Sequence, residues 1–324
     1  MSTPTMRALR CLSKGQPPVL ETIARPQPAA GELRVKIAAC GLNFADLLMV
    51  QGSYQETPAY PFTMGMEVSG VVDALGEGVS GPAVGTPVLV FGGQGGLANY
   101  ACFDASRVTP LPQGTDMVSA AALQVAYGTS HVALGYKAAL KAGETLLVLG
   151  AAGGVGLTAV EIGKLMGATV IACARGADKL AVAKAAGADH LIDAEKDDIR
   201  EAVRALGGAD VVYDPVGGDQ FKAAMRACNP EARLLSIGFA SGEVPQVPAN
   251  ILLVKNLTVM GFYWGGYLAF KPSVVTDSLT ELVRWHAEGK IKPHVSHALP
   301  LEQALEGMEL LRSRKSTGKV VITL

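Results

Sequence analysis

Short apolar runs alternate with longer amphipathic segments from about residue 145 onward. Six runs have the length and the apolar content of buried strands, at residues 145–149, 169–174, 190–193, 211–214, 233–237 and 257–262. The segments between them carry apolar residues at helical spacing. Regular alternation of strand and helix predicts a doubly wound parallel sheet.

The first 110 residues follow a different pattern, in which strand-like runs are separated by turns rich in Gly and Pro. We expect strands at residues 32–39, 67–75 and 86–91, with a turn at 76–82. After the last run of the parallel sheet, a helix is expected at 273–288 and a strand at 319–324. These two elements are predicted to return to the β-rich first domain.

The segment TLLVLGAAGGVG, residues 145–156, joins an apolar strand to a helix expected at 158–166 through a glycine-rich turn. Such a turn lets dinucleotide phosphates approach backbone N–H groups at the positive end of a helix. The turn residues predicted to bind a cofactor are Ala152, Gly153, Gly154, Val155 and Gly156. The alternative is a glycine-rich turn without a ligand, because 38 glycines make chance matches easy.

The end of the second parallel strand indicates which dinucleotide binds. An NAD site usually has Asp or Glu there, whereas this chain has Arg175, followed one helical turn later by Lys179. A guanidinium binds a 2′-phosphate through charge-assisted contacts, so the pattern predicts NADPH. Alternatively both are solvated surface charges, partly neutralised by Asp178.

Together these patterns predict an α/β fold with a Rossmann doubly wound sheet and a second, β-rich domain. The expected boundaries are 1–125 plus 268–324 for the β-rich domain and 126–267 for the Rossmann NADPH-binding domain. A chain of 324 residues has the length for two domains.

Composition and charge exclude several classes of protein. A net charge of −1 without a Lys/Arg run argues against nucleic-acid binding. We expect no signal peptide, because residues 1–16 lack an apolar segment, and no membrane span, because the longest apolar stretch is short and rich in glycine. Five scattered cysteines without CxxC pairs predict a reduced, cytoplasmic protein.

Five segments carry a family resemblance: CGLNFADLLMVQGSY (40–54), MGMEVSGVV (64–72), GAAGGVG (150–156), VVYDPVGG (211–218) and STGKVVITL (316–324). In this order the chain resembles the zinc-free, zeta-crystallin-like quinone oxidoreductases of the medium-chain dehydrogenase/reductase superfamily. The resemblance implies a GroES-like catalytic domain, a Rossmann domain, NADPH as cofactor, and a homodimer formed through edge strands of the Rossmann sheets.

The chain departs from the zinc-dependent alcohol dehydrogenases of that superfamily at the metal ligands. Those enzymes carry the motif CGxCxxD and, later in the chain, GHE, in which the second Cys and the His bind zinc. This chain has Asn43 and Met66 at these two positions. An amide and a thioether are poor substitutes for thiolate and imidazole, so we expect no metal.

Without a metal, an electron-poor acceptor still takes hydride if it is aligned and its developing charge is stabilised. The resemblance implies Tyr54 as the catalytic hydrogen-bond donor, and Asn43 is the candidate second donor and cofactor contact. The alternative for Tyr54 is a loop residue that packs against Pro58 and Pro61. The alternative for Asn43 is a turn or cap residue that bonds its own backbone. Asp46 is expected to hold backbone or side chains rather than to exchange protons.

The remaining site candidates come from the resemblance. Gln124 and Thr129 are expected at the nicotinamide or ribose, Gly238 and Phe239 beside the cofactor, and Lys319 at a phosphate. Tyr263 and Trp264 are expected to line the substrate pocket, or else to pack between domains or subunits. Ala194 stands where some family members have a tyrosine, so adenine stacking should differ here.

The sequence therefore predicts an NADPH-dependent oxidoreductase that reduces small-molecule quinones or α,β-unsaturated carbonyls by direct hydride transfer without zinc. Two alternatives stay open. One is a reductase of enoyl thioesters such as acyl-CoA, and the other is an NADPH-binding regulatory or structural protein with little turnover.

Overall fold

The computed structural model describes residues 4–324, which form two compact units. One comprises the chain up to Val125 together with residues 283–324, and the other comprises residues 126–282. The predicted assignment of residues 268–282 to the catalytic domain stays a prediction, as does the division into functional domains.

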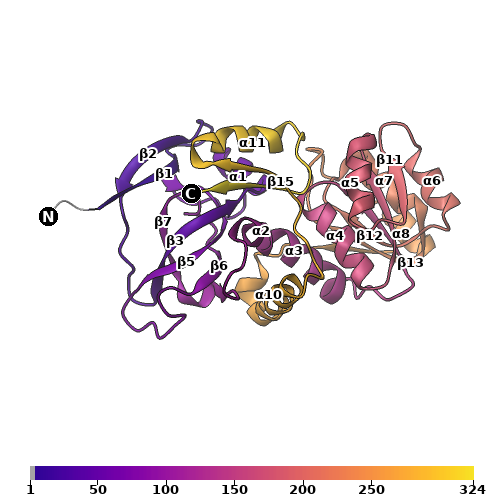
Figure 1. The fold of residues 1–324 in the computed structure, drawn as a ribbon. Coiled ribbons are helices and arrows are strands. Elements are labelled where there is room, and N and C mark those ends of the chain that lie inside the picture. Colours follow the sequence, from indigo (N-terminus) through magenta and orange to yellow (C-terminus); the bar gives the residue numbers. More distant parts are fainter. Residues whose placement is uncertain (1–3) are drawn as a thin grey trace. The chain divides into compact units, whose positions relative to one another are not determined.

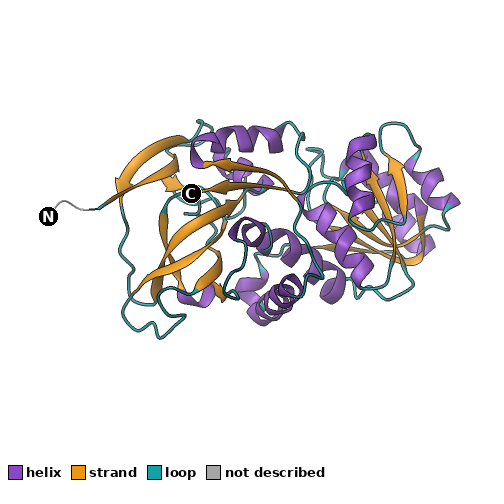
Figure 2. Cartoon of the chain, in the orientation of Figure 1, coloured by secondary structure: helices purple, strands orange, loops and turns teal. Residues whose placement is uncertain are grey.

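The first unit is built from β-strands in two sheets (Figure 1 and Figure 2). Its strands are β1 (Thr5–Cys11), β2 (Val19–Ala24), β3 (Glu32–Gly41), β4 (Phe62–Thr63), β5 (Glu67–Leu75), β6 (Pro87–Phe91), β7 (Tyr100–Asp104), β8 (Val108–Pro110), β15 (Val295–Pro300) and β16 (Lys319–Thr323). The smaller sheet has the order β2-β1-β4, and the larger one β15-β16-β3-β5-β6-β8, with β7 paired to β3. This is the predicted β-rich, GroES-like architecture.

Strand β3 lies at the centre of the larger sheet, and one of its faces carries buried apolar side chains. It pairs antiparallel with β5, β7 and β16, and Leu33, Val35 and Ile37 are almost completely buried. The register places Gly41 opposite Glu67, the first residue of β5. A carboxylate is thereby held inside the unit, at the end of a strand that is otherwise mostly apolar.

Short helices connect and flank these strands. They are α1 (Phe44–Val50), α2 (Met117–Ala121), α11 (Ala304–Arg312) and the 3₁₀ turns Ala105–Arg107 and Leu301–Gln303. Helix α1 starts where β3 ends, and Asn43 is its N-cap. The loop that follows α1 carries Tyr54.

The second unit contains a six-stranded parallel sheet in the order β11-β10-β9-β12-β13-β14, as predicted. Its strands are β9 (Thr145–Leu149), β10 (Thr169–Ala174), β11 (His190–Asp193), β12 (Ala209–Asp214), β13 (Cys228–Ser236) and β14 (Thr258–Gly261). The core between sheet and helices includes Leu147, Ile171, Val212, Phe221 and Leu234.

Helices lie on both sides of this sheet (Figure 2). The helices between residues 124 and 287 are α3 (Gln124–His131), the π-helical turn Val132–Lys137, α4 (Gly154–Leu165), α5 (Ala177–Ala185), α6 (Ile199–Ala205), α7 (Gly218–Ala227), α8 (Ala249–Lys255), α9 (Tyr267–Phe270) and α10 (Pro272–Ala287). Helix α4 starts four residues before the predicted position 158, since the glycines of the turn form its first turn.

The direction of chain winding reverses between β9 and β12. Strands β9, β10 and β11 progress toward one edge, and β12, β13 and β14 progress toward the other. In doubly wound sheets a ligand binds outside the carboxyl ends of the strands at this switch point. The glycine-rich turn after β9 stands at that position.

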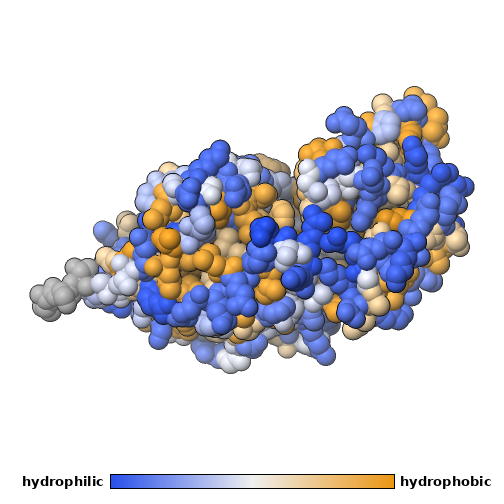
Figure 3. Space-filling view, turned by 90° about the horizontal axis from the view of Figure 1, so that it is seen from above, coloured by the Kyte–Doolittle hydropathy of each residue, from blue (hydrophilic) through white to orange (hydrophobic). Residues whose placement is uncertain are grey.

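Among the helices of residues 4–324, none combines the length and apolar character needed to cross a bilayer. Figure 3 shows hydrophobic residues interspersed with hydrophilic ones over the face it draws.

Candidate functional site

In the glycine-rich turn, the backbone of Gly150 packs directly against the start of α4. Gly150 has φ +58°, a conformation that favours glycine, and Gly153 is the N-cap of α4. A Cβ on Gly156 would lie 2.2 Å from the carbonyl oxygen of Gly150. The first N–H groups of α4 have no carbonyl partner within the helix, as at any helix start, so they suit an anion.

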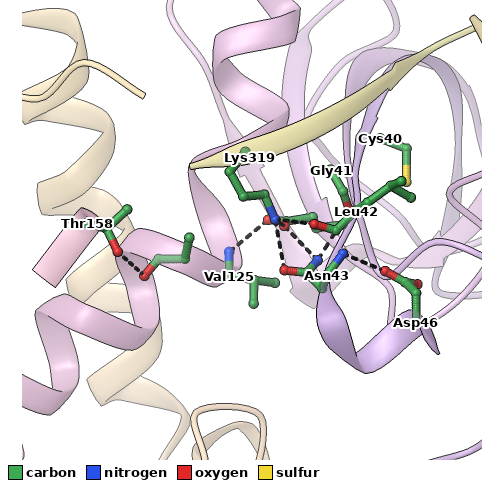
Figure 4. Close-up of polar contacts among 10 residues, drawn as sticks. Cys40, Gly41, Leu42, Asn43, Asp46, Val125, Thr158 and Lys319 are labelled. Carbon is green, nitrogen blue, oxygen red and sulfur yellow. Dashed lines mark hydrogen bonds and ion pairs between the residues drawn. The ribbon is translucent and has the colours of Figure 1, made fainter. Parts of the chain in front are cut away.

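Three buried hydroxyl groups support the first turn of α4. Ser130 Oγ donates to the carbonyl of Val155 at 2.9 Å and lies 2.8 Å from Thr158 Oγ1 and 3.0 Å from the Tyr213 hydroxyl. Thr158 Oγ1 also donates to the carbonyl of Ala126 at 3.0 Å (Figure 4). The cluster ties α3, α4 and β12 together beneath the turn. Its members are far apart in the chain, so no local sequence pattern indicates the cluster.

The loop after β10 is held by a carboxylate at the end of β11. Arg175 follows β10 directly and is exposed, and Gly176 takes up φ +79°. Gly176 N donates to Asp193 Oδ1 at 3.1 Å, and Glu195 N donates to the same oxygen. These backbone hydrogen bonds, that of Gly176 first, lower the pKa of Asp193. Lys179, on α5, is half-buried.

In the first unit, Glu67 and Lys319 form a buried ion pair (Figure 4). Lys319 Nζ lies 2.7 Å from Glu67 Oε1, and it also donates to the carbonyl of Leu42 and to Asn43 Oδ1, both at 2.8 Å. Glu67 Oε2 accepts from Val125 N at 2.8 Å. Sequence analysis did not propose Glu67. The signal for it was a lone carboxylate at the start of a buried strand.

The predicted phosphate contact of Lys319 stays a prediction, and the structure shows which groups the ammonium bonds to. An ammonium has three hydrogens, and Lys319 directs them to Leu42, Asn43 and Glu67. Its side chain is also only 5% exposed. Lys319 is therefore a structural partner of Glu67 in this structure.

The amide of Asn43 is bonded to neighbouring groups of the first unit. Its amide Nδ2 donates to Glu67 Oε1 at 2.9 Å and to the carbonyl of Gly41 at 3.2 Å, which uses both hydrogens. The alternative reading of Asn43 as a helix cap matches the structure. The catalytic and cofactor-binding roles of Asn43 stay predictions.

Asp46 holds the backbone, as expected. Its Oδ2 accepts from Asn43 N at 2.8 Å, and the carboxyl group is completely buried. Burial raises the pKa of Asp46 to about 7, although the hydrogen bond from Asn43 and the nearby Lys319 oppose this.

Tyr54 lies half-buried in the loop after α1. Thr57 bonds to the Tyr54 carbonyl through both its N–H, at 3.2 Å, and its Oγ1, at 2.7 Å, so the backbone of the loop is folded on itself. The neighbouring Tyr60 hydroxyl donates to the carbonyl of Met49 at 2.8 Å. The catalytic role of the Tyr54 phenol stays a prediction.

Gln124 and Thr129 both lie on α3 and are buried. Gln124 is 1% exposed, and within residues 4–324 neither its Oε1 nor its Nε2 has a hydrogen-bond partner. An unpaired buried amide is costly, so this side chain is a candidate for contact with a ligand.

The predicted aromatic residues differ in their surroundings. Trp264 is buried, and a Cβ on Gly128 would lie 2.8 Å from its Nε1, so the indole packs on the backbone of α3. This favours packing over substrate contact for Trp264. Tyr263 is partly exposed, Gly238 follows β13 by two residues, and Phe239 is exposed.

The positions of the superfamily's metal ligands hold Asn43 and Met66. Met66 is buried, and Asn43 is bonded as described above. In the described residues, 4–324, no group of three or more His, Cys, Asp or Glu side chains is arranged to hold a metal ion.

Two family profiles match the chain. Residues 29–113 match the family described as "Alcohol dehydrogenase GroES-like domain", and residues 154–283 match the one described as "Zinc-binding dehydrogenase". Quinone oxidoreductase-like protein 2 from Bos taurus is 38% identical over 322 residues, which cover 98% of this chain and 92% of that protein.

Solved structures show the same similarity. Quinone oxidoreductase from Thermus thermophilus, determined with its NADPH complex, has a TM-score of 0.88 and 32% identity, covering 98% of this chain and 100% of that one. The Escherichia coli quinone oxidoreductase complexed with NADPH has a TM-score of 0.90 and 28% identity, covering 99% and 100%. The chain therefore belongs to the quinone oxidoreductase family of the medium-chain dehydrogenase/reductase superfamily.

Proposed function

We propose that this protein is an NADPH-dependent oxidoreductase that reduces quinones or related α,β-unsaturated carbonyls by direct hydride transfer, without zinc. The observation that carries the proposal is the glycine turn between β9 and α4, which stands at the switch point of the parallel sheet. The two solved relatives bound to NADPH support the choice of cofactor.

The residues present fit a phosphorylated dinucleotide. The turn from Ala152 to Gly156 offers backbone N–H groups to the pyrophosphate, and Gly156 leaves no room for a side chain. Arg175, exposed directly after β10 and next to a loop held by Asp193, suits the 2′-phosphate, with Lys179 as a second cation. The unpaired amide of Gln124 suits a polar group of the cofactor. Thr129, Gly238 and Phe239 stay proposed contacts.

When bound, NADPH supplies the hydride. The protein then has to align the acceptor and stabilise the negative charge that develops on its carbonyl oxygen. We assign the donor role to the Tyr54 phenol, which leaves Asn43 and Asp46 to hold the backbone before α1. Tyr263, partly exposed, is the proposed aromatic contact of the substrate.

Zinc independence is proposed from the chemistry of the available side chains. The amide of Asn43 is committed to Glu67, Gly41 and Lys319, and the thioether of Met66 is a soft ligand that suits zinc poorly. The family described as "Zinc-binding dehydrogenase" matches residues 154–283, and this range includes neither Asn43 nor Met66.

We also propose a cytoplasmic homodimer. Strand β14 is an edge of the parallel sheet, and the same unit exposes the large apolar side chains of Leu253, Val254 and Phe270. Unpaired thiols at all five cysteines suit a reducing compartment. Light scattering after size-exclusion chromatography would test the dimer, since a monomeric mass would contradict it.

The proposed activity is tested by following NADPH oxidation with 1,2- and 1,4-quinones, short enones and crotonyl-CoA. The proposal expects turnover with a quinone or an enone. Turnover with crotonyl-CoA alone would favour an enoyl-thioester reductase, and NADPH binding without turnover on any acceptor would favour a regulatory or structural protein.

A further inference from the structure

Three hydroxyl groups meet in the interior of the second unit, on α3, α4 and β12. Ser130 and Tyr213 are completely buried, and Thr158 is buried as well. Ser130 Oγ lies 2.8 Å from Thr158 Oγ1 and 3.0 Å from the Tyr213 hydroxyl. Polar groups are costly to bury, so three of them at one place call for an explanation.

One arrangement of the hydroxyl hydrogens gives each of them an acceptor. In it the Tyr213 hydroxyl donates to Ser130, and Ser130 donates to the Val155 carbonyl at 2.9 Å. Thr158 then donates to the Ala126 carbonyl at 3.0 Å. Burial raises the pKa of Tyr213, so its hydroxyl keeps the proton that it donates. The chain of hydrogen bonds that starts at Tyr213 thus ends on the Val155 carbonyl.

The Val155 carbonyl belongs to the same peptide group as the N–H of Gly156. This N–H lies in the first turn of α4, ahead of the first hydrogen bond of the helix, which Leu157 N makes to the Gly153 carbonyl at 2.8 Å. It is therefore one of the N–H groups that suit an anion. Because a peptide group is planar, a hydrogen bond that fixes the carbonyl also fixes the direction of the N–H. The same bond polarises the peptide and strengthens the N–H as a donor.

We propose that Ser130 is a positioning residue for the pyrophosphate of the cofactor and acts through the Val155–Gly156 peptide. This rests on the proposed function, in which the glycine-rich turn binds NADPH. Tyr213 acts in turn through Ser130, whose oxygen accepts its hydrogen. Formation of α4 does not require this support, because a helical carbonyl at Val155 already accepts from the N–H of Ala159.

The test compares two fragments of the cofactor on the purified full-length protein. 2′-Phospho-ADP-ribose carries both the 2′-phosphate and the pyrophosphate, whereas adenosine 2′-monophosphate carries the 2′-phosphate alone. Affinities are measured by calorimetric titration, which requires neither an acceptor nor turnover. The variants are Ser130→Ala and Tyr213→Phe, each of which removes one hydroxyl group. The control is Ser278→Ala, which removes a buried hydroxyl that lies 2.8 Å from His131 Nδ1 in the same unit.

The proposal expects Ser130→Ala to weaken binding of 2′-phospho-ADP-ribose about three- to tenfold, because a hydrogen bond that supports the anion site is lost. Binding of adenosine 2′-monophosphate, which does not reach the turn, should stay within about twofold of the parent value. Ser278→Ala should keep both affinities of the parent. An equal loss for both fragments in Ser130→Ala, or no loss for either, would overturn the proposal.

A double-mutant cycle distinguishes action through Ser130 from a general loosening of the core. Tyr213→Phe, which keeps the aromatic ring, should weaken 2′-phospho-ADP-ribose less than Ser130→Ala does. Added to Ser130→Ala it should have no further effect, because the hydroxyl through which Tyr213 acts is already missing. Additive losses would overturn the role of Tyr213. Thermal unfolding verifies that each variant is folded.

The proposed function and this inference fail in different ways. If the fragments bind with the expected dependence on Ser130 but the protein reduces no acceptor, the proposed function is contradicted and this inference stands. If the protein oxidises NADPH with an acceptor but Ser130→Ala keeps both fragment affinities, this inference alone is contradicted.

Discussion

Asp193 Oδ1 lies 3.1 Å from the backbone nitrogen of Gly176, the residue that follows Arg175. A carboxylate at the end of the third parallel strand thus supports the loop at the end of the second. It holds that loop through the backbone, and Arg175, which we propose binds the 2′-phosphate, is exposed.

Replacing Arg175 with Ala should weaken NADPH binding about ten- to hundredfold and change NADH binding little, because only NADPH has the 2′-phosphate. Titration of both cofactors measures this. Arg204→Ala, an exposed arginine on α6 of the same unit, is the matched control. Equal weakening of both cofactors would remove Arg175 from phosphate recognition.

Replacing Tyr54 with Phe should lower kcat/KM for an enone by about ten- to thousandfold and leave NADPH affinity near the parent value, since an oxyanion donor acts mainly in the transition state. The substitution should lower kcat/KM less for a quinone than for an enone, because a quinone has a high electron affinity. Tyr60→Phe is the control, because the Tyr60 hydroxyl bonds to the Met49 carbonyl in the same segment. If Tyr54→Phe transfers hydride to both acceptors at the parent's stopped-flow rates, Tyr54 is not the donor. Alignment of the acceptor with the cofactor would then be the main source of catalysis.

Asp46 should make the protein less stable as pH rises. Burial raises its pKa to about 7 in the folded state, against about 3.9 in an unfolded chain. Between these values the folded state keeps its proton while the unfolded state ionises, so this carboxyl lowers the unfolding free energy by at most about 1.4 kcal/mol per pH unit.

Asp46→Asn should therefore reduce the loss of stability between about pH 4 and pH 7, as measured by urea unfolding at several pH values. Asp219→Asn, at an exposed aspartate, should leave the pH dependence unchanged. If the unfolding free energy of Asp46→Asn falls with pH as steeply as that of the parent, Asp46 is ionised throughout this range.

Metal analysis of the purified protein should find no stoichiometric zinc, and chelators should leave NADPH oxidation unchanged, because Asn43 and Met66 replace two ligands. One tightly held zinc per chain, with activity lost on its removal, would overturn the proposed chemistry.

Local patterns predicted the fold well, since apolar runs and glycine turns are set by neighbours in the sequence. The six parallel strands and the turn from Gly150 to Gly156 are examples. The polar contacts around Glu67 were harder to predict, because they join residues that are far apart in the sequence. Lys319 meets Glu67 across 252 positions and Asn43 across 276, so these contacts could not be inferred from spacing.

The most direct test of the proposed chemistry is a single-turnover reaction of the protein with an enone and NADPH that carries deuterium at the transferable position of the nicotinamide. Direct hydride transfer predicts that one deuterium appears on the β-carbon of the saturated product, whatever the hydrogen isotope of the solvent. A product without deuterium at that carbon, or a protein that leaves NADPH unoxidised with every quinone and enone, would contradict the account.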